Sequence, residues 1–147
     1  MDKLGKPKER PNRIMNLHKP AIQAFIGHEQ ASVIRAGMRG EEGQYYKDKI
    51  KEIDAILDRM PKTGETDGQG DNAIAYLHYF KGSADAWITE LDKGAPDDEP
   101  EQYQSQAFGL ADLGYGPELG YVSIPELLKA GMEIDLHWTP RAIKEIK

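Results

Sequence analysis

Two carboxylates and an imidazole alternate along the segment 133–138, which reads EIDLHW. In an extended strand, Glu133, Asp135 and His137 would share one face, and the apolar residues between them would share the other. Carboxylate and imidazole groups gathered on one face can bind a divalent cation or transfer protons. Acidic residues of other segments would complete such a site if the fold brought them near, namely Glu90, Asp112 and Glu118.

A solvated strand face explains the same pattern without chemistry, because antiparallel sheets often expose one charged face to water. No second histidine stands at ligand spacing from His137, as a metal site would favour. We therefore favour the solvated face and predict no catalytic residue, no metal site and no cofactor, with a metal-assisted enzyme as the alternative. The polar positions kept as candidates for function are Glu90, Asp112, Glu118, Asp135 and His137.

Other patterns that could carry chemistry fail on their context. Gly68, Gly70 and Ala73 have the spacing of a dinucleotide fingerprint, but a predicted helix precedes them and a predicted strand follows, the reverse of that motif. The same acidic loop lacks the ligand spacing and the bidentate glutamate of an EF-hand. The sequence contains no nucleophile elbow, phosphate-binding loop or HExxH motif. In the strand predicted over 73–80, His78 would share a face with Ile74, Tyr76 and Phe80, so we expect it to be a hydrogen-bonded histidine of the core or of an interface.

Charge is distributed unevenly along the chain. Residues 1–19 have a net charge of +4, whereas residues 65–135, with three Lys and fifteen Asp or Glu, have a net charge of −12. The acidic half repels phosphate backbones, so a nucleic-acid contact would have to come from the N-terminal arm. The basic residues of that arm are Lys3, Lys6, Lys8, Arg10 and Arg13. Because residues 1–14 are polar and interrupted by proline, we predict a disordered arm; both Met1 and Met15 are possible translation starts.

Helical periodicity dominates the first half. Tyr46, Ile50, Ile53, Leu57 and Met60 recur at intervals of four, three, four and three, which predicts an amphipathic helix over 41–60 with its apolar stripe in the core. A less regular stripe, which is interrupted at Gly27, predicts a preceding helical segment over 20–34.

Extended patterns dominate the second half, after a turn-rich loop at 61–72. Strands are predicted for residues 73–80, 86–91, 105–113, 119–124 and 133–138. Their short connections favour antiparallel neighbours, and Pro125 and Gly131 bound a short helix between the last two strands. The sequence thus predicts an α+β fold, with an N-terminal helical pair packed on a four- or five-stranded antiparallel sheet.

Length and composition limit the classes of protein that this chain can belong to. The chain has 147 residues, of which 39% are hydrophobic, and no cysteine, so a single domain over residues 15–147 can fold without disulfides or zinc. No apolar run is long enough to cross a membrane, and the N-terminus lacks the apolar segment of a secretory signal. We therefore expect a soluble cytoplasmic protein without membrane contacts.

From Ala86 onward, the blocks AWITELD, QAFGLADLGYGPELGYVSIPELL and EIDLHWTP occur in order. In these blocks the chain resembles the bacterial family known as domain of unknown function 2958, and the likeness extends over Ala73–Ile146. The resemblance implies a setting in phages, plasmids and integrative elements of proteobacteria, and it implies no reaction. The family motif positions present in this chain are Trp87, Glu90, Phe108, Gly109, Asp112, Gly114, Glu118, Gly120, Tyr121, Asp135 and His137.

These observations favour a small accessory protein of a phage or mobile element that acts by binding another protein, of the host or of the element, through its acidic sheet half. A metal-assisted enzyme using His137 and nearby carboxylates is one alternative. A nucleic-acid accessory protein acting through the basic arm is the other.

Overall fold

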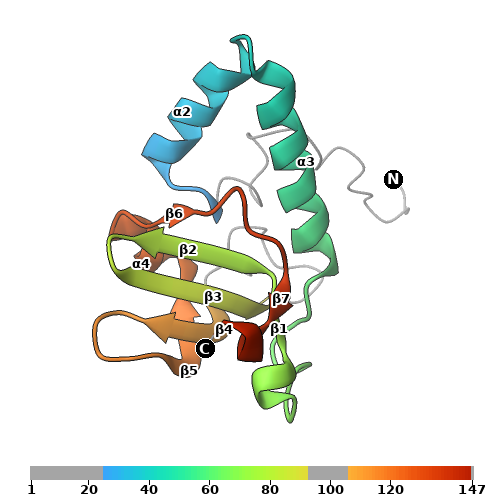
Figure 1. Cartoon of the computed structure of the whole chain (residues 1–147), viewed down its shortest axis with the longest axis vertical. Coiled ribbons are helices and arrows are strands. Elements are labelled where there is room, and N and C mark those ends of the chain that lie inside the picture. The colour runs from blue at the N-terminus through green and yellow to red at the C-terminus, as the bar shows by residue number, and fades with distance from the viewer. Residues whose placement is uncertain (1–24, 93–105, 147) are drawn as a thin grey trace, which may run out of the picture.

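The computed structural model describes residues 25–92 and 106–146. Two consecutive helices precede a five-stranded antiparallel sheet, and a short helix lies between the last two strands of that sheet in chain order (Figure 1). The predicted α+β class is therefore confirmed. The predictions for the arm 1–14 fall outside the described residues.

The two long helices form a hairpin. Helix α2 spans His28–Met38 and helix α3 spans Gly43–Arg59. The predicted stripe of α3 is confirmed, since Ile50, Ile53 and Leu57 are all buried. The interruption predicted at Gly27 in the preceding helical segment is observed, since the backbone there is extended and α2 begins after it. Residues 20–24 of that predicted segment lie outside the described residues.

The main sheet has the order β5-β4-β3-β2-β6, and every neighbouring pair is antiparallel. Its strands are β2 (Leu77–Lys81), β3 (Ala84–Leu91), β4 (Gln106–Asp112), β5 (Glu118–Ser123) and β6 (Glu133–Ile134). Helix α4, Ile124–Lys129, connects β5 to β6. In the described part of the chain, β5 and β6 are the two outermost strands of this order, so their outer backbone groups are the ones that could meet another strand.

Two of the predicted strands differ from the observed ones. The segment 73–80 is divided between β1 (Ile74–Ala75) and β2, because β1 pairs with β7 (Arg141–Ala142) in a separate two-stranded sheet. Tyr76, at the break, packs with the helices, so it does not share a face with His78. The predicted strand 133–138 ends at Ile134 and continues as a turn. The remaining short elements are the 3-10 helices η1 (Gly70–Asn72) and η2 (Ile143–Glu145).

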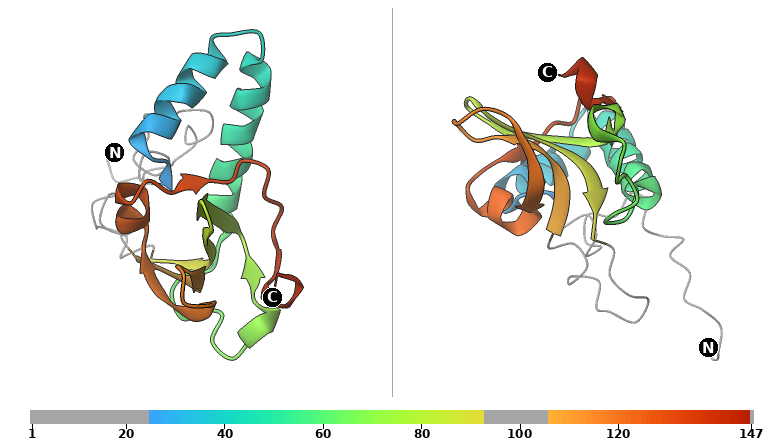
Figure 2. Two further views of the ribbon diagram at one scale, coloured as in Figure 1. Left: turned by 60° about the vertical axis from the view of Figure 1, so that its left-hand side comes forward. Right: turned by 90° about the horizontal axis from the view of Figure 1, so that it is seen from below.

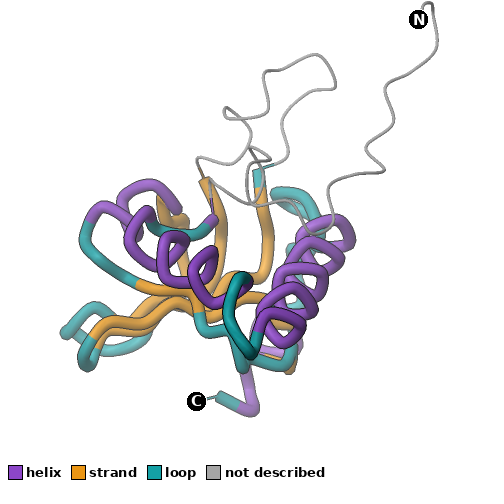
Figure 3. The backbone as a smooth tube through the Cα atoms, turned by 90° about the horizontal axis from the view of Figure 1, so that it is seen from above, coloured by secondary structure: helices purple, strands orange, loops and turns teal. Residues whose placement is uncertain are grey.

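The faces of the main sheet are covered unequally. One face packs against α2, α3 and α4 around a core that includes Tyr79, Ile88 and Ile134. On the opposite face, Ala75, Leu110 and Ile143 form a smaller cluster. Figures 2 and 3 show η2 and the C-terminal end on the side of the sheet away from α4. The C-terminal segment therefore covers only part of this outer face.

Candidate functional site

Glu90 is a structural anchor of the loop that follows α3. Its carboxylate is buried, with 3% of the residue exposed. One carboxylate oxygen accepts a hydrogen bond from the Gly64 amide at 2.8 Å, and the other accepts from the Thr66 amide at 2.9 Å. The Thr66 hydroxyl donates to the same oxygen. Three donors therefore use most of the roughly four acceptor positions of this carboxylate, and they tie it to the loop.

Asp112 and Glu118 flank the turn between β4 and β5. The Asp112 side chain accepts a hydrogen bond from the Gly114 amide at 3.2 Å, which is a turn-stabilising contact. Gly114 and Gly116 supply left-handed backbone conformations, with φ of 114° and 96°. Glu118 is exposed at the first position of β5. Of these two acids, one thus shapes the turn and the other faces solvent.

Asp135 and His137 do not share a face, because the strand ends before they are reached. The Asp135 side chain accepts a hydrogen bond from the His137 amide at 2.9 Å and so closes a turn. The exposed His137 ring lies beside α3, with its Nε2 3.3 Å from the Tyr45 hydroxyl. The prediction that Glu133, Asp135 and His137 form one polar face is therefore wrong at His137.

The structure brings Asp135 instead to His78. The two nitrogens of the His78 ring lie 2.9 Å from an Asp135 oxygen and 2.8 Å from an Asp85 oxygen. Each ring nitrogen thus has a carboxylate partner within hydrogen-bonding distance. The prediction of a hydrogen-bonded histidine at position 78 is confirmed.

Aromatic side chains enclose the His78 cluster. Trp87 stacks on the His78 ring at 5.3 Å between centroids and an angle of 8°, and Trp138 lies at 5.1 Å. The Trp138 indole donates to the Ala75 carbonyl at 3.0 Å, and the Arg141 guanidinium lies 4.3 Å from the Trp138 ring centre. The cluster therefore fastens the C-terminal segment across β2 and β3. Within residues 25–92 and 106–146, no group of three His, Asp or Glu side chains is arranged to hold a metal ion.

Exposed apolar side chains gather at the β4–β5 hairpin. Four of the seven large hydrophobic residues that are exposed among the described residues lie there, namely Leu113, Tyr115, Leu119 and Tyr121. We call these four residues the hairpin surface. Tyr115 is 94% exposed and Tyr121 is 62% exposed, and the Tyr121 ring packs edge-on against Phe108 with 5.2 Å between centroids.

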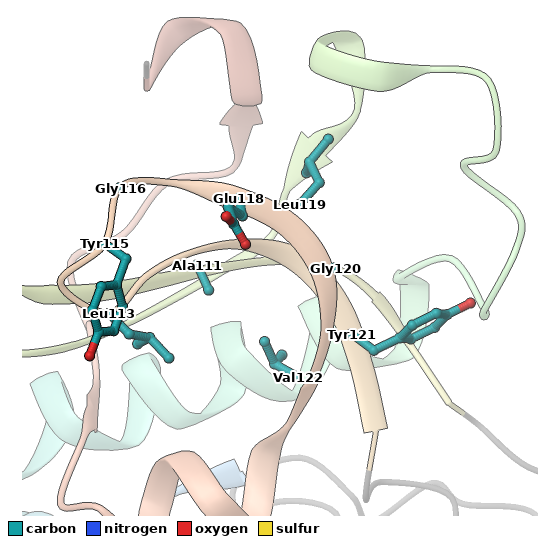
Figure 4. A pocket seen from close by; sticks show the side chains of 9 residues that line it. All are labelled: Ala111, Leu113, Tyr115, Gly116, Glu118, Leu119, Gly120, Tyr121 and Val122. Atoms are coloured by element: carbon teal, nitrogen blue, oxygen red, sulfur yellow. The ribbon is translucent and has the colours of Figure 1, made fainter.

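A hollow of about 220 Å³ adjoins the hairpin surface. It is lined by Ala111, Gly116, Glu118, Gly120 and Val122 together with the four hairpin-surface residues (Figure 4). In Figure 4 the Ala111 and Val122 side chains point to the same side of the hairpin, and Tyr121 points away to another side. Sequence reasoning missed this hollow, because it requires the register of β4 with β5 and the small residues at positions 111 and 120.

The chain segment that contains the hairpin carries only negative charge. Residues 94–128 contain seven Asp or Glu and no Lys, Arg or His. Among the described residues of this segment, the acids are Asp112, Glu118 and Glu126. The candidate site thus combines exposed aromatic and aliphatic side chains with a hollow whose lining includes the Glu118 carboxylate.

No protein-family model, curated protein sequence or solved structure matches this chain. No helix within the described part of the chain is long and apolar enough to cross a membrane.

Proposed function

We propose that this chain is a non-enzymatic protein-binding module, an accessory protein of a phage or mobile element that binds its partner through the β4–β5 hairpin in its acidic half. The genetic setting rests on the resemblance of residues 73–146. The binding role rests on one observation: Leu113, Tyr115, Leu119 and Tyr121 are exposed together on one hairpin.

Physical chemistry connects this surface to protein binding. Exposed large apolar side chains are common singly, but a group of them at one place marks an interaction site. Tyrosine is enriched at interfaces because its ring buries a large apolar area while its hydroxyl stays hydrogen-bonded. The hairpin surface has two such residues, Tyr115 and Tyr121, beside the hollow.

The two alternatives have less support. A metal-assisted enzyme would need His137 near the candidate carboxylates, yet His137 contacts Tyr45 and the Glu90 carboxylate accepts its hydrogen bonds from Gly64 and Thr66. A nucleic-acid accessory role would use the basic arm, which lies outside the described residues. No observation on the described residues favours that role.

A capture experiment with matched variants tests the proposal. The tagged full chain, a Leu119→Ser/Tyr121→Ser variant and a control Val33→Ser/Tyr45→Ser variant are incubated with bacterial host lysate, and bound proteins are quantified by mass spectrometry. The control removes two exposed apolar residues from the helices, where Val33 is 64% and Tyr45 is 38% exposed. We expect a protein that the wild type and the control retain and the hairpin variant loses. If no retained protein depends on the hairpin residues while all three chains melt alike, the proposal is wrong.

A further inference from the structure

We propose that β5 binds its partner by strand addition: a basic, extended segment of another protein pairs antiparallel with the free edge of β5 and inserts a large apolar side chain into the hollow over Gly120. This inference rests on the proposed protein-binding function and specifies its geometry and its partner chemistry.

The two edges of the main sheet are treated differently. At β6, the Gln30 side-chain amide donates to the Ile134 carbonyl and accepts from the Ile134 amide, both at 2.9 Å. Gln30 thereby takes the place of a neighbouring strand. At β5, the only strand partner among the described residues is β4. Because alternate residues of an antiparallel strand direct their amide and carbonyl groups to opposite sides, half of these groups in β5 point toward the free edge.

Gly120 lies in the middle of this edge strand without a packing reason. Its cross-strand partner Gly109 must be glycine, since an added Cβ would lie 1.9 Å from the Trp87 carbonyl oxygen. An added Cβ at Gly120 would meet no atom within 4 Å among the described residues. Glycine weakens a strand, and its presence there often marks a place where a ligand or a second backbone comes close. Here its missing side chain opens the hollow.

The geometry of an antiparallel pair determines which partner side chains would face which residues of β5. Residues directly opposite each other in an antiparallel pair share one face of the sheet. The partner residue opposite Gly120 therefore faces the hollow, and the one opposite Glu118, two positions later in the partner chain, faces that carboxylate. Partner residues opposite Leu119 and Tyr121 lie on the other face, against the hairpin surface. The partner thus carries a large apolar residue followed two positions later by Lys or Arg.

The charge of the residues around β5 indicates which kind of segment would bind there. Residues 106–128, which contain β5, have three acids (Asp112, Glu118 and Glu126) and no basic residue, so a basic segment is attracted to this strand. A second copy of this chain would bring the same acidic segment to the edge and would be repelled. We therefore assign the edge to another protein and not to a dimer of this chain.

The test uses the full chain and a displayed library of random octapeptides. We expect enrichment of peptides in which a large apolar residue precedes Lys or Arg by two positions. Such a peptide should bind Gly120→Val, which fills the hollow, at least about tenfold more weakly. It should bind Glu118→Lys at least about fivefold more weakly, with recovery when the peptide's basic residue is changed to Glu. Glu126→Lys, the same charge change on α4, is the matched control and should alter affinity less.

Backbone methylation gives a readout specific to strand pairing. N-methyl groups placed on alternate peptide residues should weaken binding about tenfold or more in one phase of alternation and little in the other. Enriched peptides that lack the predicted spacing, or that bind Gly120→Val normally, would overturn the inference and leave the binding function standing. Strand addition is equally refuted if a hairpin-dependent lysate partner exists but no peptide is enriched, or if sedimentation shows a dimer that Gly120→Val dissociates. If, in addition, no lysate protein depends on the hairpin residues for its capture, the proposed function itself is refuted.

Discussion

Replacing Glu90 by glutamine distinguishes a structural carboxylate from a functional one. The carboxylate accepts hydrogen bonds from the amides of Gly64 and Thr66 and from the Thr66 hydroxyl. A glutamine amide has the same shape but only one acceptor oxygen. Whichever way the amide turns, at least one of these donors faces an NH₂ group.

The size of the effect follows from the buried groups involved. Leaving one buried donor unsatisfied costs about 1 to 3 kcal/mol, and hydrogen bonds to a charged acceptor contribute about 1.5 to 3 kcal/mol each. Relief of the desolvation cost of the buried charge offsets part of this loss. We therefore expect Glu90→Gln to lower the free energy of unfolding by about 2 to 4 kcal/mol. For a chain of this length, that corresponds to a fall in Tm of about 5 to 15 °C.

Urea unfolding followed by tryptophan fluorescence measures this change, and amide hydrogen exchange at Thr66 reports the loop directly. Glu65→Gln is the matched control, because the exposed Glu65 side chain in the same loop accepts from the Lys62 amide at 2.8 Å. The control should lose under about 0.5 kcal/mol. If Glu90→Gln is as stable as Glu65→Gln and Thr66 exchanges no faster, the anchoring role of Glu90 is refuted.

Three further predictions concern the core and the histidine of the C-terminal turn. Ile53→Ala should lower the unfolding free energy by about 2 to 5 kcal/mol, whereas Val33→Ala at an exposed position of α2 should change it by under about 0.5 kcal/mol; equal denaturation midpoints would contradict the core assignment. Burial raises the pKa of Tyr79 above its ordinary value of about 10. The contribution of the protonated Tyr79 hydroxyl to the free energy of unfolding is therefore complete below pH 10, and above it this free energy falls by about 1.4 kcal/mol per pH unit. Tyr79→Phe should flatten the alkaline fall in stability, and an unchanged slope would count against this assignment. His137→Ala should leave stability unchanged with or without zinc, manganese, magnesium or calcium; a saturable metal effect near 2.7 kcal/mol at about a hundred times the Kd, lost in the variant, would favour the metal-assisted enzyme.

Helix α3 and the β2–β3 hairpin could be predicted, because both depend on residues that are close in the sequence. The spacing of Ile50, Ile53 and Leu57 identifies the buried side of α3, because a helix repeats every 3.6 residues whatever surrounds it. The short connection between the predicted strands 73–80 and 86–91 likewise predicts the β2–β3 hairpin. Its register, with His78 opposite Trp87 and Phe80 opposite Asp85, places the Asp85 carboxylate beside His78. The contact between His78 and Asp85 could therefore have been inferred from the sequence.

Contacts between segments that are far apart in the sequence could not be predicted from it. Asp135 meets His78 because β6 pairs with β2 across more than fifty residues, and period-two reasoning on 133–138 could not reveal that the strand stops at Ile134. The role of Glu90 depends in the same way on the loop at Gly64 and Thr66. Polar residues are the hardest to assign from sequence, because one carboxylate can anchor a loop, close a turn or face a partner, and only its neighbours decide which.

The way the sheet is covered explains why the proposed binding surface lies at β4 and β5. The helices bury one face, and on the other the C-terminal segment packs Ile143 against Leu110 and Trp138 beside His78. This cover leaves Leu119 and Tyr121 exposed, at 42% and 62%. The His78 cluster holds the C-terminal segment over β2 and β3 and is not part of the proposed binding surface. Among the described residues, exposed apolar side chains and a strand edge without a partner occur together at the hairpin, where Glu118 lies beside the hollow.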